Sequence, residues 1–282
     1  KVIQIAFVLY GVAMTGIGAK LFDLQMITRQ EGQSSHTIGD VEAARFAQVG
    51  TFSEKLLVSQ DSLVKVEPDL PLDVAALVSC GVATGWGSAV HRADVKAGDT
   101  VAVIGIGGVG INAVQGARMA GAKRVIAIDP VEFKREKAME MGATHTYSSI
   151  EEAQLAVPDL TWGDMCDAVI LVPGVVTGEM IEPALTLTSK GGTLVVTAIG
   201  NMLQTDAALN LFMLSMMNKE IKGTIFGSGN PRYDIPALLS MYREGDLKLD
   251  ELITNRYPLD DVNKGYQDLR DGKNIRGVLD FT

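Results

Sequence analysis

The chain has 282 residues, enough for one large or two ordinary domains, and its 47% hydrophobic content allows a sizeable core. Its formal net charge of −9, without basic clusters, argues against binding to nucleic acid or to an anionic membrane. Two cysteines cannot form a disulfide framework, so reduced thiols and a cytoplasmic location are expected.

The first fifty residues carry few clear patterns. Residues 1–20 combine a lysine, an apolar run and small residues, as a secretory signal peptide does, but Gln4 interrupts the run, which favours a buried strand followed by a glycine turn. Residues 29–50 are polar and contain glycine, so they predict a loop that holds His36. The chain begins with lysine rather than methionine, which leaves a trimmed or incomplete product as one expectation.

Two patterns precede the central part of the chain. Residues 51–68 alternate as short strands do. Residues 70–93 begin with Leu70 and Pro71 and continue with apolar residues at helical spacing, so they predict two short helices joined across Cys80. No later stretch has the roughly 18 unbroken apolar residues of a membrane span.

Predicted strands and helices then alternate. Strands are expected at residues 99–105, 123–129, 166–172, 193–200 and 221–227, and helices at 108–122, 133–143, 178–192 and 209–220. The tail adds amphipathic helices at 234–246 and 259–273 and a closing strand at 275–281. This order implies right-handed βαβ crossovers and therefore the α/β class with a doubly wound parallel sheet.

A glycine-rich loop follows the first strand of this alternation. Gly105, Gly107 and Gly110 have G-x-G-x-x-G spacing, between a predicted strand and a predicted helix. Gly105 allows a tight turn, Gly107 lets the backbone approach a pyrophosphate, and Gly110 permits close packing of helix on strand. The loop, with Gly108 and Val109, predicts a dinucleotide bound at the amino end of the helix. A glycine turn without a ligand is the less favoured alternative.

Asp129 ends the next predicted strand, 19 residues after Gly110. A carboxylate at this position can accept hydrogen bonds from the adenosine ribose and would repel a 2′-phosphate, which favours NAD over NADP. Lys134 lies one helical turn further and can reach the same ribose, although a solvated helix lysine is equally consistent with the sequence.

Several motifs with conserved spacing carry a family resemblance. They are residues 79–90, the 25-residue interval from Cys80 to Gly105, the glycine loop, residues 126–130 and the tail from 223 to 281. Together they resemble the zinc-dependent medium-chain alcohol dehydrogenases, nearest to the actinobacterial-type group that holds its nicotinamide cofactor tightly. The resemblance covers roughly residues 50–282.

The resemblance implies a Rossmann fold joined to the remnant of a β-rich GroES-like catalytic domain. It implies a partial catalytic domain at residues 1–81, an NAD-binding domain at 82–225 and a C-terminal segment at 226–282 that returns to the catalytic domain. The implied activity is NAD-dependent interconversion of an alcohol and an aldehyde by zinc-assisted hydride transfer.

The resemblance also implies roles for individual residues. Cys80 matches the third protein ligand of the catalytic zinc, and Thr84 matches a residue beside the nicotinamide ring. Val172 and Ala198 match the region that carries the nicotinamide, and Arg276 matches an arginine that approaches the pyrophosphate. An exposed surface arginine is the alternative for Arg276.

The sequence departs from the family at the metal sites. The Cys and His patterns of the first two catalytic ligands are absent, as is the proton relay. Residues 6–24 contain no cysteine, so no Cys-based structural zinc is expected. His36, His91 and His145 favour structural or solvated roles, and Cys166 favours core packing. One cysteine cannot hold a catalytic zinc, so this chain is expected to be inactive unless other residues or another chain complete the site.

The sequence is also consistent with two other functions. A zinc-free quinone or enoyl reductase would explain the missing cysteines, although Asp129 counts against its usual NADP. A non-catalytic NAD-binding module would use the edge strand within residues 218–228 to hold a partner. The expected partners are a small alcohol or aldehyde and further copies of the chain, in a homodimer as in the family or in a homotetramer.

Overall fold

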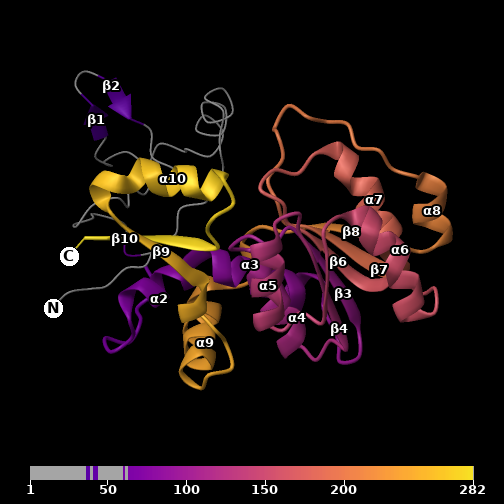
Figure 1. Cartoon of the computed structure of the whole chain (residues 1–282), viewed down its shortest axis with the longest axis horizontal. Helices are drawn as coiled ribbons and strands as arrows, with labels where there is room; N and C mark the ends of the chain where they lie inside the picture. The colour runs from indigo at the N-terminus through magenta and orange to yellow at the C-terminus, as the bar shows by residue number, and fades with distance from the viewer. Residues whose placement is uncertain (1–35, 39–40, 44–59, 61–62, 282) are drawn as a thin grey trace.

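The structure is a computed structural model that describes residues 36–38, 41–43, 60 and 63–281 (Figure 1). The strand and turn predicted for residues 1–20 lie outside the described residues. His36 belongs to strand β1 (His36–Ile38), which pairs antiparallel with β2 (Val41–Ala43), so the prediction of a loop there was wrong. Residues 63–67 have no regular secondary structure, so the strands predicted for that part of the chain were also wrong.

A six-stranded parallel sheet has the order β5-β4-β3-β6-β7-β8. Its strands are β3 (Thr100–Ile104), β4 (Arg124–Ile128), β5 (His145–Tyr147), β6 (Cys166–Leu171), β7 (Thr188–Val196) and β8 (Glu220–Gly223). Its helices are α4 (Gly110–Met119), α5 (Glu132–Glu140), α6 (Ile150–Thr161), α7 (Ile181–Leu187) and α8 (Leu211–Met216). The chain builds outward from β3 in one direction and then from β6 in the other, which confirms the doubly wound Rossmann sheet.

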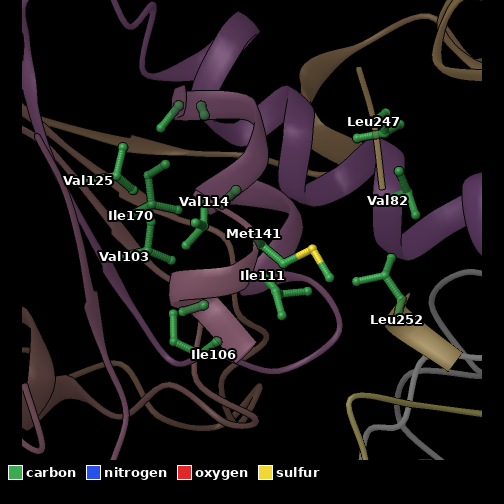
Figure 2. Packing of buried hydrophobic residues seen from close by; sticks show 14 of the residues in the cluster. Val82, Val103, Ile106, Ile111, Val114, Val125, Met141, Ile170, Leu247 and Leu252 are labelled. Atoms are coloured by element: carbon green, nitrogen blue, oxygen red, sulfur yellow. The ribbon is translucent and has the colours of Figure 1, made fainter. Parts of the chain in front are cut away.

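Both faces of the sheet are covered, as the apolar strands predict. Val101 and Val103 of β3 belong to a cluster with α4 and α5, which Figure 2 shows from close by. Ala102 and Ile104 point to the opposite face and belong to a second cluster with α6 and α7. Successive residues of one strand therefore bury their side chains in two different cores.

The segment that holds Cys80 is one helix of 21 residues, Leu72–Arg92, so the prediction of two helices was wrong. It consists of α2 (Leu72–Leu77), the π-helical segment η3 (Val78–Val82), α3 (Ala83–Gly87) and the π-helical segment η4 (Ser88–Arg92). The residues at its internal junctions keep right-handed helical dihedral angles, so its glycines do not interrupt it. Its length and hydropathy match a membrane span, but 67% of its most apolar window is buried in the protein, as in a core helix.

The C-terminal lobe, which here means residues 229–281, lies beside the sheet in Figure 1. It contains α9 (Pro231–Arg243), β9 (Ile253–Pro258), α10 (Val262–Arg270) and β10 (Arg276–Asp280). Strands β9 and β10 form a two-stranded parallel sheet. The division into three domains stays a prediction, and its first boundary falls inside the continuous helix.

Some predicted elements differ in extent. Helix α7 ends at Leu187 and β7 begins at Thr188, although residues 178–192 had predicted one helix. Strand β8 ends at Gly223, and Phe226–Ser228 form a 3-10 turn, η6. Helix α6, which contains Pro158, and strands β5 and β9 had not been predicted.

Candidate functional site

A cleft of about 1080 Å³ lies at the carboxyl ends of the central strands, where a doubly wound sheet binds its ligands. It is lined by ten of the predicted site residues: Cys80, Gly105, Gly107, Gly108, Val109, Asp129, Lys134, Val172, Ala198 and Arg276. Thr84 and Gly110 do not line it. The structure therefore gathers residues that follow four strands (β3, β4, β6 and β7), a residue of the Cys80 helix and one of β10 around one cavity.

The glycine loop forms the floor of the cleft. Gly105 follows β3 with φ +95°, and a Cβ there would lie 2.6 Å from the carbonyl oxygen of Val172, so only glycine fits. A Cβ at Gly110 would overlap the carbonyl oxygen of Gly105, so this position packs α4 on the loop. A Cβ at Gly107 would meet no atom within 4 Å, so the backbone there faces open space.

Asp129 connects the end of β4 to the glycine loop. Its Oδ2 accepts a hydrogen bond from the Ile106 amide (2.8 Å) and its Oδ1 accepts one from the Val131 amide (2.9 Å). The side chain is buried but lines the cleft. A carboxylate has about four acceptor positions, so these bonds leave room for a ribose hydroxyl.

Arg276 reaches the cleft from a β-bulge at the start of β10, between Arg276 and Gly277. Thr254 fixes this bulge, because its Oγ1 donates to the Arg276 carbonyl (3.0 Å) and accepts from the Ile275 amide (3.1 Å). A Cβ at Gly108, or one at Gly81, would overlap the guanidinium group of Arg276. The guanidinium therefore lies between the glycine loop and the Cys80 helix, and Arg276 is not a surface arginine.

Cys80 lies on the side of the cleft and is only 6% exposed. Burial raises the pKa of its thiol, while the positive charge of Arg276 and the nearby Thr84 hydroxyl act in the opposite direction. The balance keeps the group protonated near neutral pH. Thr84 itself is buried behind the cleft wall, and its carbonyl oxygen accepts a hydrogen bond from Ser88 Oγ (2.7 Å).

The described residues do not fit a zinc ion. Within them, no three His, Cys, Asp or Glu side chains lie together as a metal site. His91 instead approaches Asp234 of α9 (Nε2 to Oδ1, 3.3 Å), and its ring stands edge-on to Trp86. His145 lies in β5, where burial and Arg124 lower its pKa.

Cys166 lies at the start of β6 and is fully buried in the second core cluster. Burial, together with the charge of Asp167, raises the pKa of its thiol to about 12. The prediction of core packing is confirmed.

Several cleft residues had not been predicted. They come from the residues after β5, from α10 and from the turn after α10, and include Ser148, Ser149, Tyr266, Arg270 and Gly272. Strand β5 has only three residues and gives a weak pattern. Long-range packing of the C-terminal lobe brings the carboxyl end of α10 to the cleft, and no local pattern encodes it.

Comparison with known proteins places the chain in a family. Residues 108–244 match the model of a family described as zinc-binding dehydrogenase. The chain is 50% identical over 263 residues to an NDMA-dependent alcohol dehydrogenase of Amycolatopsis methanolica, an alignment that covers 93% of this chain and 70% of that relative. It is 52% identical over 234 residues to alcohol dehydrogenase B of Mycobacterium tuberculosis, covering 83% of this chain and 62% of that relative.

Solved structures agree with the fold. A benzyl alcohol dehydrogenase from Acinetobacter calcoaceticus superposes with a TM-score of 0.73 at 27% identity, over 78% of this chain and 59% of the other. A zinc-binding-domain alcohol dehydrogenase from Burkholderia ambifaria gives 0.70 at 29% identity, over 77% and 57%. The glycine loop, the cleft and these relatives together lead to one assignment. The chain belongs to the zinc-binding alcohol dehydrogenase family.

Proposed function

We propose that the cleft binds NAD and that the chain takes part in the interconversion of an alcohol and an aldehyde. The observation that carries the proposal is the position of the Arg276 guanidinium against Gly108. A cation from the C-terminal lobe and the backbone of the glycine loop meet at one point. Arginine and backbone amides at the amino end of a helix are both groups that bind phosphate oxygens, so a pyrophosphate suits this point.

Asp129 supports NAD rather than NADP. Its two hydrogen bonds with backbone amides hold the carboxylate in place at the edge of the cleft. A 2′-phosphate at this edge would bring a second negative charge next to it. Lys134 lies in the same wall and can donate to a ribose hydroxyl.

Bound NAD supplies a ring that accepts hydride from an alcohol carbon. The chain's own residues orient that ring: Val172 and Ala198 lie at the carboxyl ends of β6 and β7 and line the cleft. Cys80, beside them, is the one described residue that matches a family zinc ligand. Zinc would need further ligands from outside the described residues.

The relatives' names favour alcohols over quinones as substrates. Because the chain spans only 62–70% of these relatives, the activity of the whole protein rests on the proposal. The test is to incubate the purified chain with NAD and a deuterated primary alcohol, and to measure both the NADH formed and the deuterium that it carries. A parallel reaction includes NDMA, on which the Amycolatopsis relative depends. Deuterated NADH supports the alcohol dehydrogenase, whereas binding without transfer favours the non-catalytic module. Reaction only with NADPH and a quinone or enoyl substrate favours the reductase.

We also propose that the protein is cytoplasmic. We further propose that it pairs with a second copy of itself through the β8 edge of the sheet. Strand β8 pairs with β7 on one side. Exposed apolar side chains lie on α8, on β8 and at the start of η6: Leu211, Phe212, Met216, Ile221, Ile225 and Phe226. Exposed apolar patches of this kind mark interfaces, and an edge strand offers free backbone groups for pairing.

A further inference from the structure

A chain of buried amide side chains connects the glycine loop to the C-terminal lobe. It consists of Asn112 and Gln115, both on α4 and both buried. Neither lines the cleft, and neither has a role in the proposed function. Buried polar side chains need hydrogen-bond partners, and the partners of these two lie in the glycine loop and in the C-terminal lobe.

Asn112 holds the glycine loop. Its Nδ2 donates to the carbonyl oxygen of Gly108 at 2.9 Å. The Gly108–Val109 peptide is trans and planar, so fixing its carbonyl toward Asn112 turns the Val109 amide N–H in the opposite direction. Asn112 thus fixes the orientation of a peptide that lines the cleft.

Gln115 holds the C-terminal lobe. Its Nε2 donates to the Lys248 carbonyl (2.9 Å) and its Oε1 accepts from the Lys248 amide (2.9 Å). The same Nε2 also donates to Asn112 Oδ1 at 3.2 Å. The two amides are therefore joined to each other, to the loop and to the lobe by four hydrogen bonds.

The attachment at Lys248 is rigid. Its neighbours Leu247 and Leu249 are 1% and 0% exposed and belong to the cluster that contains Ile111 of α4. Figure 2 shows Leu247 and Leu252 in this cluster with Val82 of the Cys80 helix. A shift of the lobe that carries Arg276 therefore strains the bonds to Gln115.

We propose that Asn112 and Gln115 are positioning residues that couple the peptide of Gly108 to the C-terminal lobe, so that the glycine loop and Arg276 act on a pyrophosphate as one unit. The inference rests on the proposed binding of NAD. It adds that the contribution of Arg276 to binding depends on two residues that never touch the cofactor.

The test is a double-mutant cycle with Gln115→Met and Arg276→Ala, read by NADH titration well below the melting temperature. Gln115→Met keeps the length of the side chain and removes all its hydrogen bonds. We expect it to raise the Kd for NADH on the order of tenfold, the size of one or two lost hydrogen bonds. We also expect Arg276→Ala to have a smaller effect in the Gln115→Met background than in the wild type.

Gln154→Met is the matched control. Gln154 also donates to a backbone carbonyl, that of Pro183 (2.9 Å), but this bond joins α6 to α7, away from the C-terminal lobe. Loss of this bond should leave the Kd for NADH within about twofold of the wild type. The effects of Gln154→Met and Arg276→Ala on the binding free energy should add. If Gln115→Met does not fold, Gln115→Glu replaces it, since Glu can keep the bond from the Lys248 amide.

The inference would be overturned if Gln115→Met left the Kd for NADH unchanged and its effect on the binding free energy simply added to that of Arg276→Ala. The proposed function would remain intact. If the wild type binds no NADH, the proposed function fails, and hydrogen exchange without cofactor decides the coupling. Faster exchange in both residues 105–112 and residues 272–281 of Gln115→Met, but not of Gln154→Met, supports it. Exchange that changes in only one of these segments contradicts it.

Discussion

The Asp129 carboxylate accepts a hydrogen bond from the Ile106 amide at 2.8 Å, and so joins the end of β4 to the glycine loop after β3. The residue expected to bind a ribose is thus also part of the support of the phosphate-binding loop. Its second oxygen accepts from the Val131 amide, so both oxygens face backbone donors.

Asp129→Asn should therefore weaken both the fold and cofactor binding. An asparagine offers one oxygen, and its NH₂ group would face a backbone N–H that has lost its acceptor. We expect a loss of about 1–3 kcal/mol in the free energy of unfolding, together with weaker NADH binding, measured by urea denaturation and fluorescence titration. Asp159→Asn, on the exposed face of α6, is the control and should change neither. Unchanged stability of Asp129→Asn would show that the two backbone bonds contribute nothing.

Gly81 and Gly85 should respond differently to alanine, although both lie in the Cys80 helix. A methyl group at Gly81 would meet the end of the flexible Arg276 side chain, which can move away. Gly81→Ala should therefore keep its melting temperature within about 2 °C but raise the Kd for NADH on the order of tenfold. A methyl group at Gly85 would meet the Val109 backbone, which cannot move without shifting α4.

Gly85→Ala should accordingly lower the stability of the fold by about 1–3 kcal/mol. Thermal melting and NADH titration of the two variants separate the effects. A Gly81→Ala variant that binds NADH as the wild type does would contradict the proposed role of Arg276 in cofactor binding.

Cys166 should make the protein less stable in alkali. The unfolded thiol loses its proton near its ordinary pKa of 9.0, whereas the folded one keeps it to about 12. Between these values the unfolded state binds fewer protons, so the free energy of unfolding falls as the pH rises, by up to about 1.4 kcal/mol per pH unit. Below pH 9 this contribution is constant.

Cys166→Ala should show a shallower decline above pH 9 than the wild type in urea unfolding at a series of pH values. From pH 6 to 8 the difference in unfolding free energy between the two proteins should stay constant, which serves as the internal control. In this range the Cys166 thiol keeps its proton in both the folded and the unfolded state. Parallel curves up to pH 12 would mean that Cys166 ionises as easily in the folded protein as in the unfolded chain.

Ile225→Lys should disrupt the proposed pairing at the β8 edge. Ile225 is 67% exposed, so the charge costs little in a single chain, but an interface would bury it. Light scattering should show a dimer for the wild type and a monomer for the variant. Leu155→Lys, on the 82% exposed Leu155 of α6, should leave the dimer intact. A monomeric wild type would contradict the proposed pairing.

The local patterns predicted the centre of the fold. Residues 99–129 contain a strand, a glycine loop, a helix and a second strand in the order and spacing of a dinucleotide-binding βαβ unit, so the elements support one another's assignment. The same agreement placed Asp129 and the glycines at one cleft. Cys166 was recognisable because it lies in an apolar strand that both layers of helices bury.

Long-range packing decided what the sequence did not predict. Two helices joined across Cys80 had been predicted, but the segment is one helix. Its glycines at 81, 85 and 87 each provide space for a neighbour from another element: Arg276, Val109 and Gly227. Arg270 and Gly272 reach the cleft because the C-terminal lobe lies beside the sheet and places the carboxyl end of α10 at the cleft. The hydrogen bonds of Asn112 and Gln115 could not be predicted from the sequence. Asn112 bonds to Gly108 in the loop, and Gln115 bonds to Lys248, 133 residues later in the chain.

The most direct test of the account is an equilibrium titration of the full chain with NADH, with Arg276→Ala and Asp129→Asn measured alongside. We expect one NADH to bind per chain, binding to be weaker in both variants, and NADPH to bind more weakly than NADH. A folded chain that binds no dinucleotide, or one whose affinity neither substitution changes, would contradict it.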